Sequence, residues 1–202
     1  MAGHTPLDDA CDAELVRWAT AGHRDSFAEI YRRYHKVVYR FARMMSGSLE
    51  IAEDVTQETF TTLLRDLPRY TPARAALSTY LYGVARNLTR SRLRSERRFV
   101  RFELTDDSEP VSPRDPSTVF EQSQRRMRLR RVIGELPSRY REVVILCGLH
   151  GLSYAEVAVI LGTPVGTVRS RLSRGRRAIA DRLRELEGNP DVAPPRAARC
   201  VV

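Results

Sequence analysis

The side chains of this sequence that are best suited to chemistry are those that could hydrogen-bond to nucleic acid. Five polar residues fall on one side of an expected helix that begins near Pro164: Arg169, Ser170, Ser173, Arg174 and Arg177. Arginine can donate two hydrogen bonds to one guanine or bind phosphate, and serine is short enough to allow close approach to a DNA groove. The other side of this helix carries an apolar stripe: Val168, Leu172, Gly175, Ile179, Leu183 and Leu186. The pattern favours a DNA-reading helix over its alternative, a helical hairpin with a solvated basic face.

A second helix must hold the first in place. Ser153 and Glu156 have the spacing of a capping box, which starts a helix whose expected buried side is Ala155, Val157, Ala158 and Leu161. Gly162 suits the left-handed residue that ends a helix. We expect Thr163 to cap the next helix, with Pro164 at its first position. Two helices joined by so short a turn predict a helix-turn-helix.

The expected helix that begins at Leu77 carries a second basic surface. Its polar side holds Asn87, Arg90, Ser91 and Arg94, and the segment from Arg86 to Arg101 contains seven arginines and one acid. Tyr70, Tyr80 and Tyr82 are aromatic residues that could stack on exposed bases, with core packing as the alternative. Nucleic-acid contact and a solvated basic face remain equal alternatives for this helix.

The expected helix from Glu50 to Leu67 is acidic. Asp54, Gln57 and Glu58 gather on one side of it. An acidic stripe repels DNA and suits a basic protein surface, while simple solubility is the alternative.

The composition limits the possible functions. The formal net charge is +9 and the isoelectric point about 10.1, which favour a polyanionic partner. No Walker A, HExxH or GxSxG motif is present, and His4, His23, His35 and His150 are isolated, so we expect neither an enzyme nor a small-molecule substrate. Cys11, Cys147 and Cys200 form no metal-binding pattern, so no metal or cofactor is expected. With no signal peptide and no membrane-length apolar run, we expect a cytoplasmic protein.

The pattern of elements predicts an all-α fold with two small helical domains. We place the first domain at residues 1–100, an acidic proline-containing linker at 101–121, the second domain at 122–187 and a disordered tail at 188–202. Residues 102–121 hold six acids against one arginine, together with three prolines, which is typical of a mobile linker.

The order of these segments resembles the bacterial RNA polymerase sigma factors of the extracytoplasmic-function group. "DVTQETF" (residues 54–60) resembles the core-binding helix of the family, "LSTYLYGVARNLTRSRLR" (77–94) its −10 element helix, and "GLSYAEVAVILGTPVGTVRSRLSRGRRAI" (151–179) its −35 helix-turn-helix. The resemblance implies a transcription initiation factor that binds core RNA polymerase, through the β′ clamp helices and the β flap, and promoter DNA. It also implies an anti-sigma factor as a partner.

The resemblance also implies roles for residues. Asp54, Gln57 and Glu58 would bind the polymerase, and the −35 element would be read by Arg169, Ser170, Ser173 and Arg174, with Arg177 at phosphate. Asn87, Arg90, Ser91, Arg94 and Tyr80 would contact the melted −10 strand, beside a base pocket formed by the loop 69–76. The family commonly has tryptophan where this chain has Tyr80, which puts the stacking role of that position in doubt.

Two other functions remain open from the residues. A stand-alone helix-turn-helix regulator would need a dimerisation or ligand-sensing domain. An enzyme such as a recombinase with a helix-turn-helix tail would need a catalytic motif.

Overall fold

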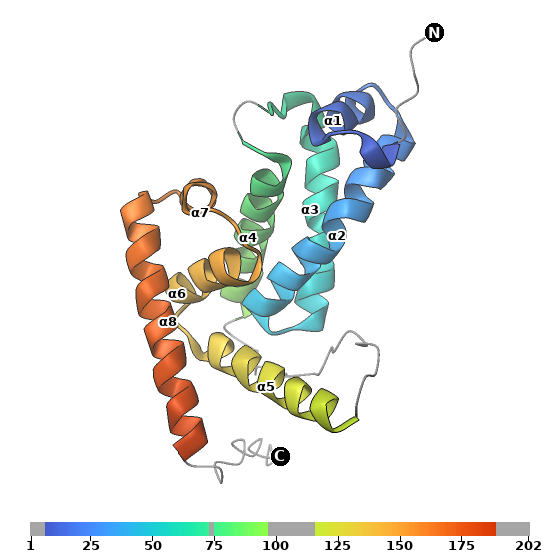
Figure 1. Cartoon of the computed structure of the whole chain (residues 1–202). Helices are drawn as coiled ribbons and strands as arrows, with labels where there is room; N and C mark the ends of the chain where they lie inside the picture. Colours follow the sequence, from blue (N-terminus) through green and yellow to red (C-terminus); the bar gives the residue numbers. More distant parts are fainter. Residues whose placement is uncertain (1–6, 73–74, 97–115, 189–202) are drawn as a thin grey trace, which may run out of the picture.

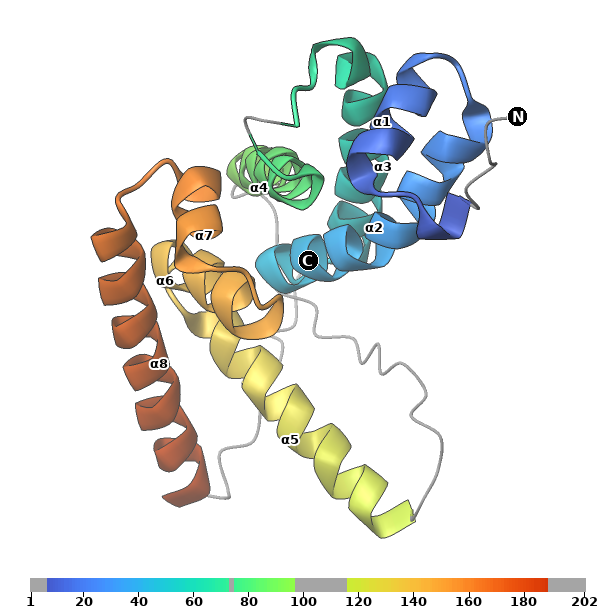
Figure 2. The same cartoon turned by 45° about the horizontal axis from the view of Figure 1, so that its top comes forward.

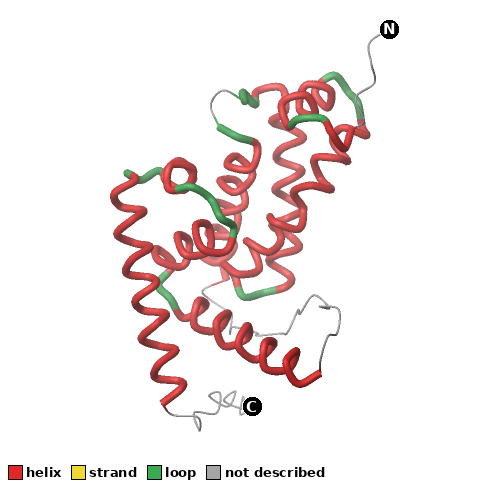
Figure 3. The backbone as a smooth tube through the Cα atoms, in the orientation of Figure 1, coloured by secondary structure: helices red, strands yellow, loops and turns green. Residues whose placement is uncertain are grey.

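A computed structural model describes residues 7–72, 75–96 and 116–188 of the chain, which form helices joined by turns (Figure 1 and Figure 3). In chain order the elements are η1 (Leu7–Asp9), α1 (Asp12–Thr20), α2 (Arg24–Ser46), α3 (Leu49–Asp66), η2 (Leu67–Arg69), α4 (Leu77–Glu96), α5 (Pro116–Glu135), α6 (Ser138–Val143), the π-helical turn η3 (Val144–Leu149), α7 (Tyr154–Leu161) and α8 (Val165–Gly188). None of the described residues is in a strand, as expected for an all-α chain.

Helices α1 to α4 form the N-terminal bundle, in which α2 packs against the other three. The apolar stripe of α2 places Ile30 and Phe41 in the core, where neither side chain is exposed. Gly47 ends α2 in the left-handed conformation, and the Ser48 hydroxyl accepts a hydrogen bond from the Ile51 N–H to start α3. Local capping thus fixes the sharp α2–α3 hairpin that presents the acidic side of α3.

Helices α5 to α8 form the C-terminal half, in which α8 packs against α5, α6 and α7. The helix α5 begins at Pro116, so residues 116–121 at the end of the expected linker are helical. Proline suits the first turn of a helix because its missing N–H needs no partner there. Residues 97–115, which hold the rest of the expected linker, and 189–202 of the expected tail lie outside the described residues.

The helix-turn-helix forms with two corrections to its details. The Ser153–Glu156 capping box is present, and Gly162 has the left-handed φ of 61°. The expected cap at Thr163 with Pro164 at the first helical position is wrong, because α8 begins at Val165, directly after Pro164. The Thr163 N–H donates to the Ala158 carbonyl of α7, and its buried Oγ1 has no partner among the described residues. The buried side of α7 includes Ile160 and not Ala155, because residues three and four apart share the face that meets α8.

The two halves pack against each other, with α4 touching α7 and α2 touching α5 and α6 (Figure 2). Buried apolar side chains from both halves belong to one continuous core cluster. In Figure 2 the helix α4 lies between α3 and α7, so the −10 candidate helix is packed on two sides.

Candidate DNA and polymerase interfaces

The five residues predicted on the reading side of α8 all have exposed side chains: Arg169, Ser170, Ser173, Arg174 and Arg177. The buried side of the helix is set by Val168 and Leu172, as the stripe predicted. The Ser170 hydroxyl donates to the Thr167 carbonyl at 3.1 Å, so its oxygen can still accept a hydrogen bond from a partner. The structure therefore brings these residues together on one accessible helix face.

Two tyrosines contact arginines of this face, and neither contact was predicted. The Arg169 guanidinium lies 5.7 Å from the ring centroid of Tyr154, which is 39% exposed. A hydrogen bond from Arg174, together with the charge of Arg139, lowers the pKa of Tyr140. The sequence signal that could have found Tyr154 is a large aromatic residue at the first position of α7 that no apolar stripe required.

The polar side of α4 is exposed at Asn87, Arg90, Ser91 and Arg94. These residues therefore share an accessible face, as predicted. The adjoining loop is described only in part, since residues 73–74 lie outside the described residues, so the predicted base pocket stays a prediction.

Tyr80 lies at the edge of this face and is partly buried. Its hydroxyl donates to Asp66 Oδ2 at 2.9 Å, and its ring meets Tyr70 edge-on at a centroid distance of 5.5 Å. Burial and the Asp66 carboxylate raise the pKa of Tyr80 to about 12. The phenol is thus neutral and tethered, which holds the ring in one orientation. Tyr82 is a core residue, 5% exposed.

Charged and polar groups of α4 bond across to the C-terminal half. Glu142 of α6, 3% exposed, accepts from Arg86 Nε at 3.1 Å and lies 3.8 Å from Arg90 Nε. Tyr82 Oη and His150 Nδ1 are 2.7 Å apart. Burial, and then the charge of Arg40, lower the pKa of His150 to about 4, so this imidazole is neutral and accepts from the tyrosine. Arg90, a predicted −10 contact, is therefore next to a carboxylate of the other half.

The acidic side of α3 divides into two parts. Asp54 and Gln57 are exposed, while Glu58 pairs with Arg92 of α4 at 2.9 Å, each side chain being 44% exposed. Successive helical residues turn by about 100°, so Gln57 faces α2 while Glu58 faces α4. The structure keeps Asp54 accessible between them.

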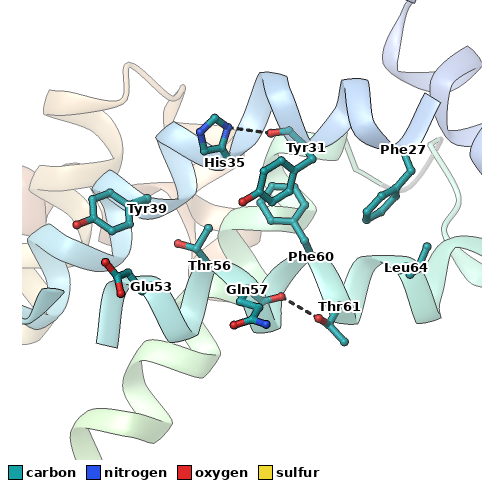
Figure 4. Close-up of a pocket in the computed structure, with 10 residues that line it drawn as sticks. All are labelled: Phe27, Tyr31, His35, Tyr39, Glu53, Thr56, Gln57, Phe60, Thr61 and Leu64. Atoms are coloured by element: carbon teal, nitrogen blue, oxygen red, sulfur yellow. Dashed lines mark hydrogen bonds between the residues drawn. The ribbon is translucent and has the colours of Figure 1, made fainter. Parts of the chain in front are cut away.

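Gln57 lines a groove between α2 and α3 with a volume of about 540 Å³ (Figure 4). Its lining residues come from both helices: Phe27, Tyr31, His35, Tyr39, Glu53, Thr56, Gln57, Phe60, Thr61 and Leu64. Tyr31 is stacked on His35 at 5.0 Å and tilted against Phe60 at 4.7 Å. Two large apolar side chains of the groove are exposed, Tyr31 at 44% and Leu64 at 55%. Sequence reasoning missed this apolar surface beside the acidic stripe.

The described residues contain no group of three histidine, cysteine or acidic side chains that could hold a metal ion. Cys11 is exposed and Cys147 partly buried, and Cys200 lies outside the described ranges. Of the described helices, none is both long enough and apolar enough to cross a membrane.

Comparison with known proteins assigns both halves to one family. Residues 30–99 match the family model of sigma-70 region 2, and residues 126–179 match that of sigma-70 region 4; together they cover more than half of the chain. The chain is similar to the ECF RNA polymerase sigma factor SigW of Bacillus subtilis, 32% identical over 183 residues that cover 85% of this chain and 96% of SigW. It is 35% identical to SigE of Mycolicibacterium smegmatis over 160 residues, which are 78% of this chain and 62% of SigE.

Two solved structures share the fold at 22% identity. One is the sigma factor RpoE in complex with the anti-sigma factor NepR from Bartonella quintana, with a TM-score of 0.66 over 78% of this chain and 96% of that one. The other is CnrH in complex with the cytosolic domain of CnrY, with a TM-score of 0.66 over 89% of this chain and 99% of that one. The sequence matches favour a polymerase-bound factor over a stand-alone regulator, because region 2 accompanies region 4. The chain thus belongs to the extracytoplasmic-function (ECF) group of sigma-70 factors, the transcription initiation factors that bind core RNA polymerase and direct it to specific promoters.

Proposed function

We propose that the chain binds core RNA polymerase through α3 and the adjoining groove, and reads promoter DNA with α4 and α8. The observation that carries this proposal is the separation of charge: exposed acidic and apolar groups lie on α3, while exposed arginines and serines lie on α8. A polyanion repels the first surface and attracts the second.

The polymerase surface combines Asp54, Gln57 and Glu58 with the apolar groove. Charges at such an interface steer the encounter and fix its register, while buried aromatic and aliphatic anchors supply most of the affinity. Tyr31 and Leu64, exposed beside Gln57, are suited to be those anchors. The partner surface is accordingly basic with apolar side chains, which suits the β′ clamp helices implied by the resemblance.

The DNA surfaces are assigned to the two predicted sets. On α8, Arg169, Ser170, Ser173 and Arg174 read bases of the −35 element and Arg177 binds phosphate. On α4, Asn87, Arg90, Ser91 and Arg94 contact the −10 strand, with Tyr80 at the edge.

Reading both elements at once requires the two halves to separate. The −35 and −10 elements lie about 25 base pairs apart, about 85 Å of B-DNA. In the structure α4 touches α7, whose eight residues are about 12 Å long, and α7 leads directly into α8. We therefore propose that residues 1–100 and 122–187 act as separable units on the promoter.

Other partners follow from the family. We propose that an anti-sigma factor holds the chain inactive, as the resemblance implies. The chain acts by binding, in the cytoplasm where polymerase and DNA are, and contributes no catalytic step of its own.

Charge reversal on α3 tests the proposed polymerase surface. Asp54→Arg should abolish capture of core RNA polymerase and promoter-dependent transcription, because like charges placed together at an interface cost several kcal/mol. Asp9→Arg, at an exposed acid on η1, is the matched control and should bind normally. Equal binding by both folded variants would show that this part of α3 is not the docking surface.

A further inference from the structure

An aromatic residue that the core does not use lies beside the reading side of α8. Tyr154 is 39% exposed at the first position of α7, so its ring is not needed to fill the interior. The Arg169 guanidinium lies over that ring, 5.7 Å from its centroid. This distance is within the roughly 6 Å at which a cation is attracted to an aromatic face.

The position of the ring is fixed by the local fold. Ser153 and Glu156 form a capping box, so the backbone just before Tyr154 is held by two hydrogen bonds of 2.8 and 3.2 Å. The tight turn at Gly162, together with buried side chains of both helices such as Val157 and Val168, then fixes α7 relative to α8. The backbone that carries the ring is therefore held in place, and a tyrosine side chain has only two rotatable bonds, whereas arginine has large rotamer entropy.

No carboxylate competes for this arginine within the described ranges. Glu156, the acid of the same capping box, accepts from the Ser153 N–H. The Tyr154 ring is the partner that the described residues show for the Arg169 guanidinium.

We infer that Tyr154 is a positioning residue for promoter recognition: its ring pre-orients Arg169 to donate two hydrogen bonds to a guanine of the −35 element. The inference rests on the proposed base contact of Arg169. Stacking on a fixed ring limits the orientations of the planar guanidinium fork before DNA arrives, which lowers the entropy lost on binding. The face of the ring orients the guanidinium, so the tyrosine hydroxyl is not required.

The test uses the full chain assembled with core RNA polymerase and a duplex library randomised over about ten base pairs at the −35 position. Bound duplexes are sequenced, which gives the base preference at every position. Arg169→Ala should erase the preference for guanine at one position. Tyr154→Ala should weaken that same preference about two- to five-fold and leave the other positions unchanged, the range expected for an exposed cation–π contact.

Three further variants separate positioning from a structural role. Tyr154→Phe should match the wild type, because the ring remains. Tyr154→Ala should add nothing in the Arg169→Ala background. Arg177→Ala, at a predicted phosphate contact, should weaken all sequences alike.

Each contrary outcome has one meaning. If Arg169→Ala leaves the base preference intact, the proposed base contact fails and the inference fails with it. If Arg169→Ala erases the guanine preference but Tyr154→Ala leaves that preference unchanged or strengthens it, only the inference about Tyr154 is overturned. If Tyr154→Phe weakens the guanine preference, the tyrosine hydroxyl makes a contact of its own, for example to phosphate, and the inference is also overturned. Thermal unfolding of Tyr154→Ala and Tyr154→Leu checks that the fold survives. If both variants lose base preference equally at every position of the duplex, Tyr154 does not position Arg169.

Discussion

Glu142 of α6 and Arg86 of α4 form a buried ion pair between the two halves of the chain, with 3.1 Å between Glu142 Oε2 and Arg86 Nε. The side chains are 4% and 12% exposed, so solvent screens the pair weakly. The same carboxylate lies 3.8 Å from Arg90 Nε, a predicted −10 contact. The proposed separation of the halves on a promoter would break this pair and leave Arg86 and Arg90 available to DNA phosphates.

Removal of this carboxylate should loosen the contact between the halves. Glu142→Ala leaves Arg86 without its buried partner, which should lower the free energy of unfolding by about 3 kcal/mol. Arginine-specific cleavage within residues 97–115 should become faster. Glu135→Ala is the control, since Glu135 forms exposed pairs with Arg131 and Arg182 that contribute at most about 1 kcal/mol. Equal stability and equal cleavage of both variants would argue against an interdomain role of Glu142.

Much of the fold could be predicted because its signals are local. Gly47, Ser48 and Gly162 mark helix ends through short-range hydrogen bonds that a sequence reveals. Ser26 and Glu29 also have the spacing of a capping box, but they do not start a helix: α2 begins at Arg24, and the Glu29 carboxylate accepts from Arg32 and Arg33. A correct spacing alone does not fix the helix start.

The contacts between the halves could not be predicted. Helix α4 is packed on two sides, so Tyr82 and Thr89 are buried outside the apolar stripe that a one-sided helix shows. The burial of Glu142 could not be predicted either, because charged residues are rarely buried unless they are paired, and its partner Arg86 lies far away in the sequence. The exposed Leu64 was likewise unremarkable in sequence, since its role depends on Tyr31 of another helix.

Gly175 should be intolerant of any side chain, because α8 packs closely there against α6 and the start of η3. A Cβ at this position would lie 2.7 Å from Val144 Cγ2 and 3.5 Å from Tyr140 Cβ. Gly175→Ala should lower the free energy of unfolding by about 1–2 kcal/mol, since the overpacking outweighs the gain of up to about 1 kcal/mol in helix propensity. The measurement is urea unfolding followed by circular dichroism.

Two variants make this test specific. Gly166→Ala in the same helix meets no atom within 4 Å and should be neutral or stabilising. Val144→Ala removes the methyl group that clashes, so it should cost less stability in the Gly175→Ala background than in the wild type. Additive losses would show that the two positions do not compete for space.

His150 should make the stability of the chain depend on pH. Its folded pKa of about 4 lies below the ordinary value of 6.5, so the unfolded chain binds a proton at a pH where the folded chain does not. The contribution of His150 to the free energy of unfolding should thus be fully present above pH 6.5 and be lost as the pH drops toward 4. Between pH 7 and pH 5 the loss should be about 1–2 kcal/mol after allowance for partial exposure. His150→Gln keeps an acceptor for the Tyr82 hydroxyl but does not titrate, so its stability should fall less over this range. Parallel curves for the two proteins would remove His150 as the cause.

The groove between α2 and α3 should contribute to polymerase binding through apolar contact as well as charge. Leu64 is 55% exposed on the groove, so a polar residue there should change the free energy of unfolding by no more than about 0.5 kcal/mol. Leu64→Glu would place a charge where the proposed interface buries an apolar anchor, and the loss of such an anchor typically costs 2 kcal/mol or more, about a thirty-fold loss of affinity. Leu64→Met keeps an apolar side chain of similar volume and should bind almost as the wild type does. The affinity for core polymerase, measured by titration of the labelled chain, decides between them. If Leu64→Glu binds as tightly as Leu64→Met, the groove lies outside the interface and docking rests on Asp54 and its polar neighbours alone.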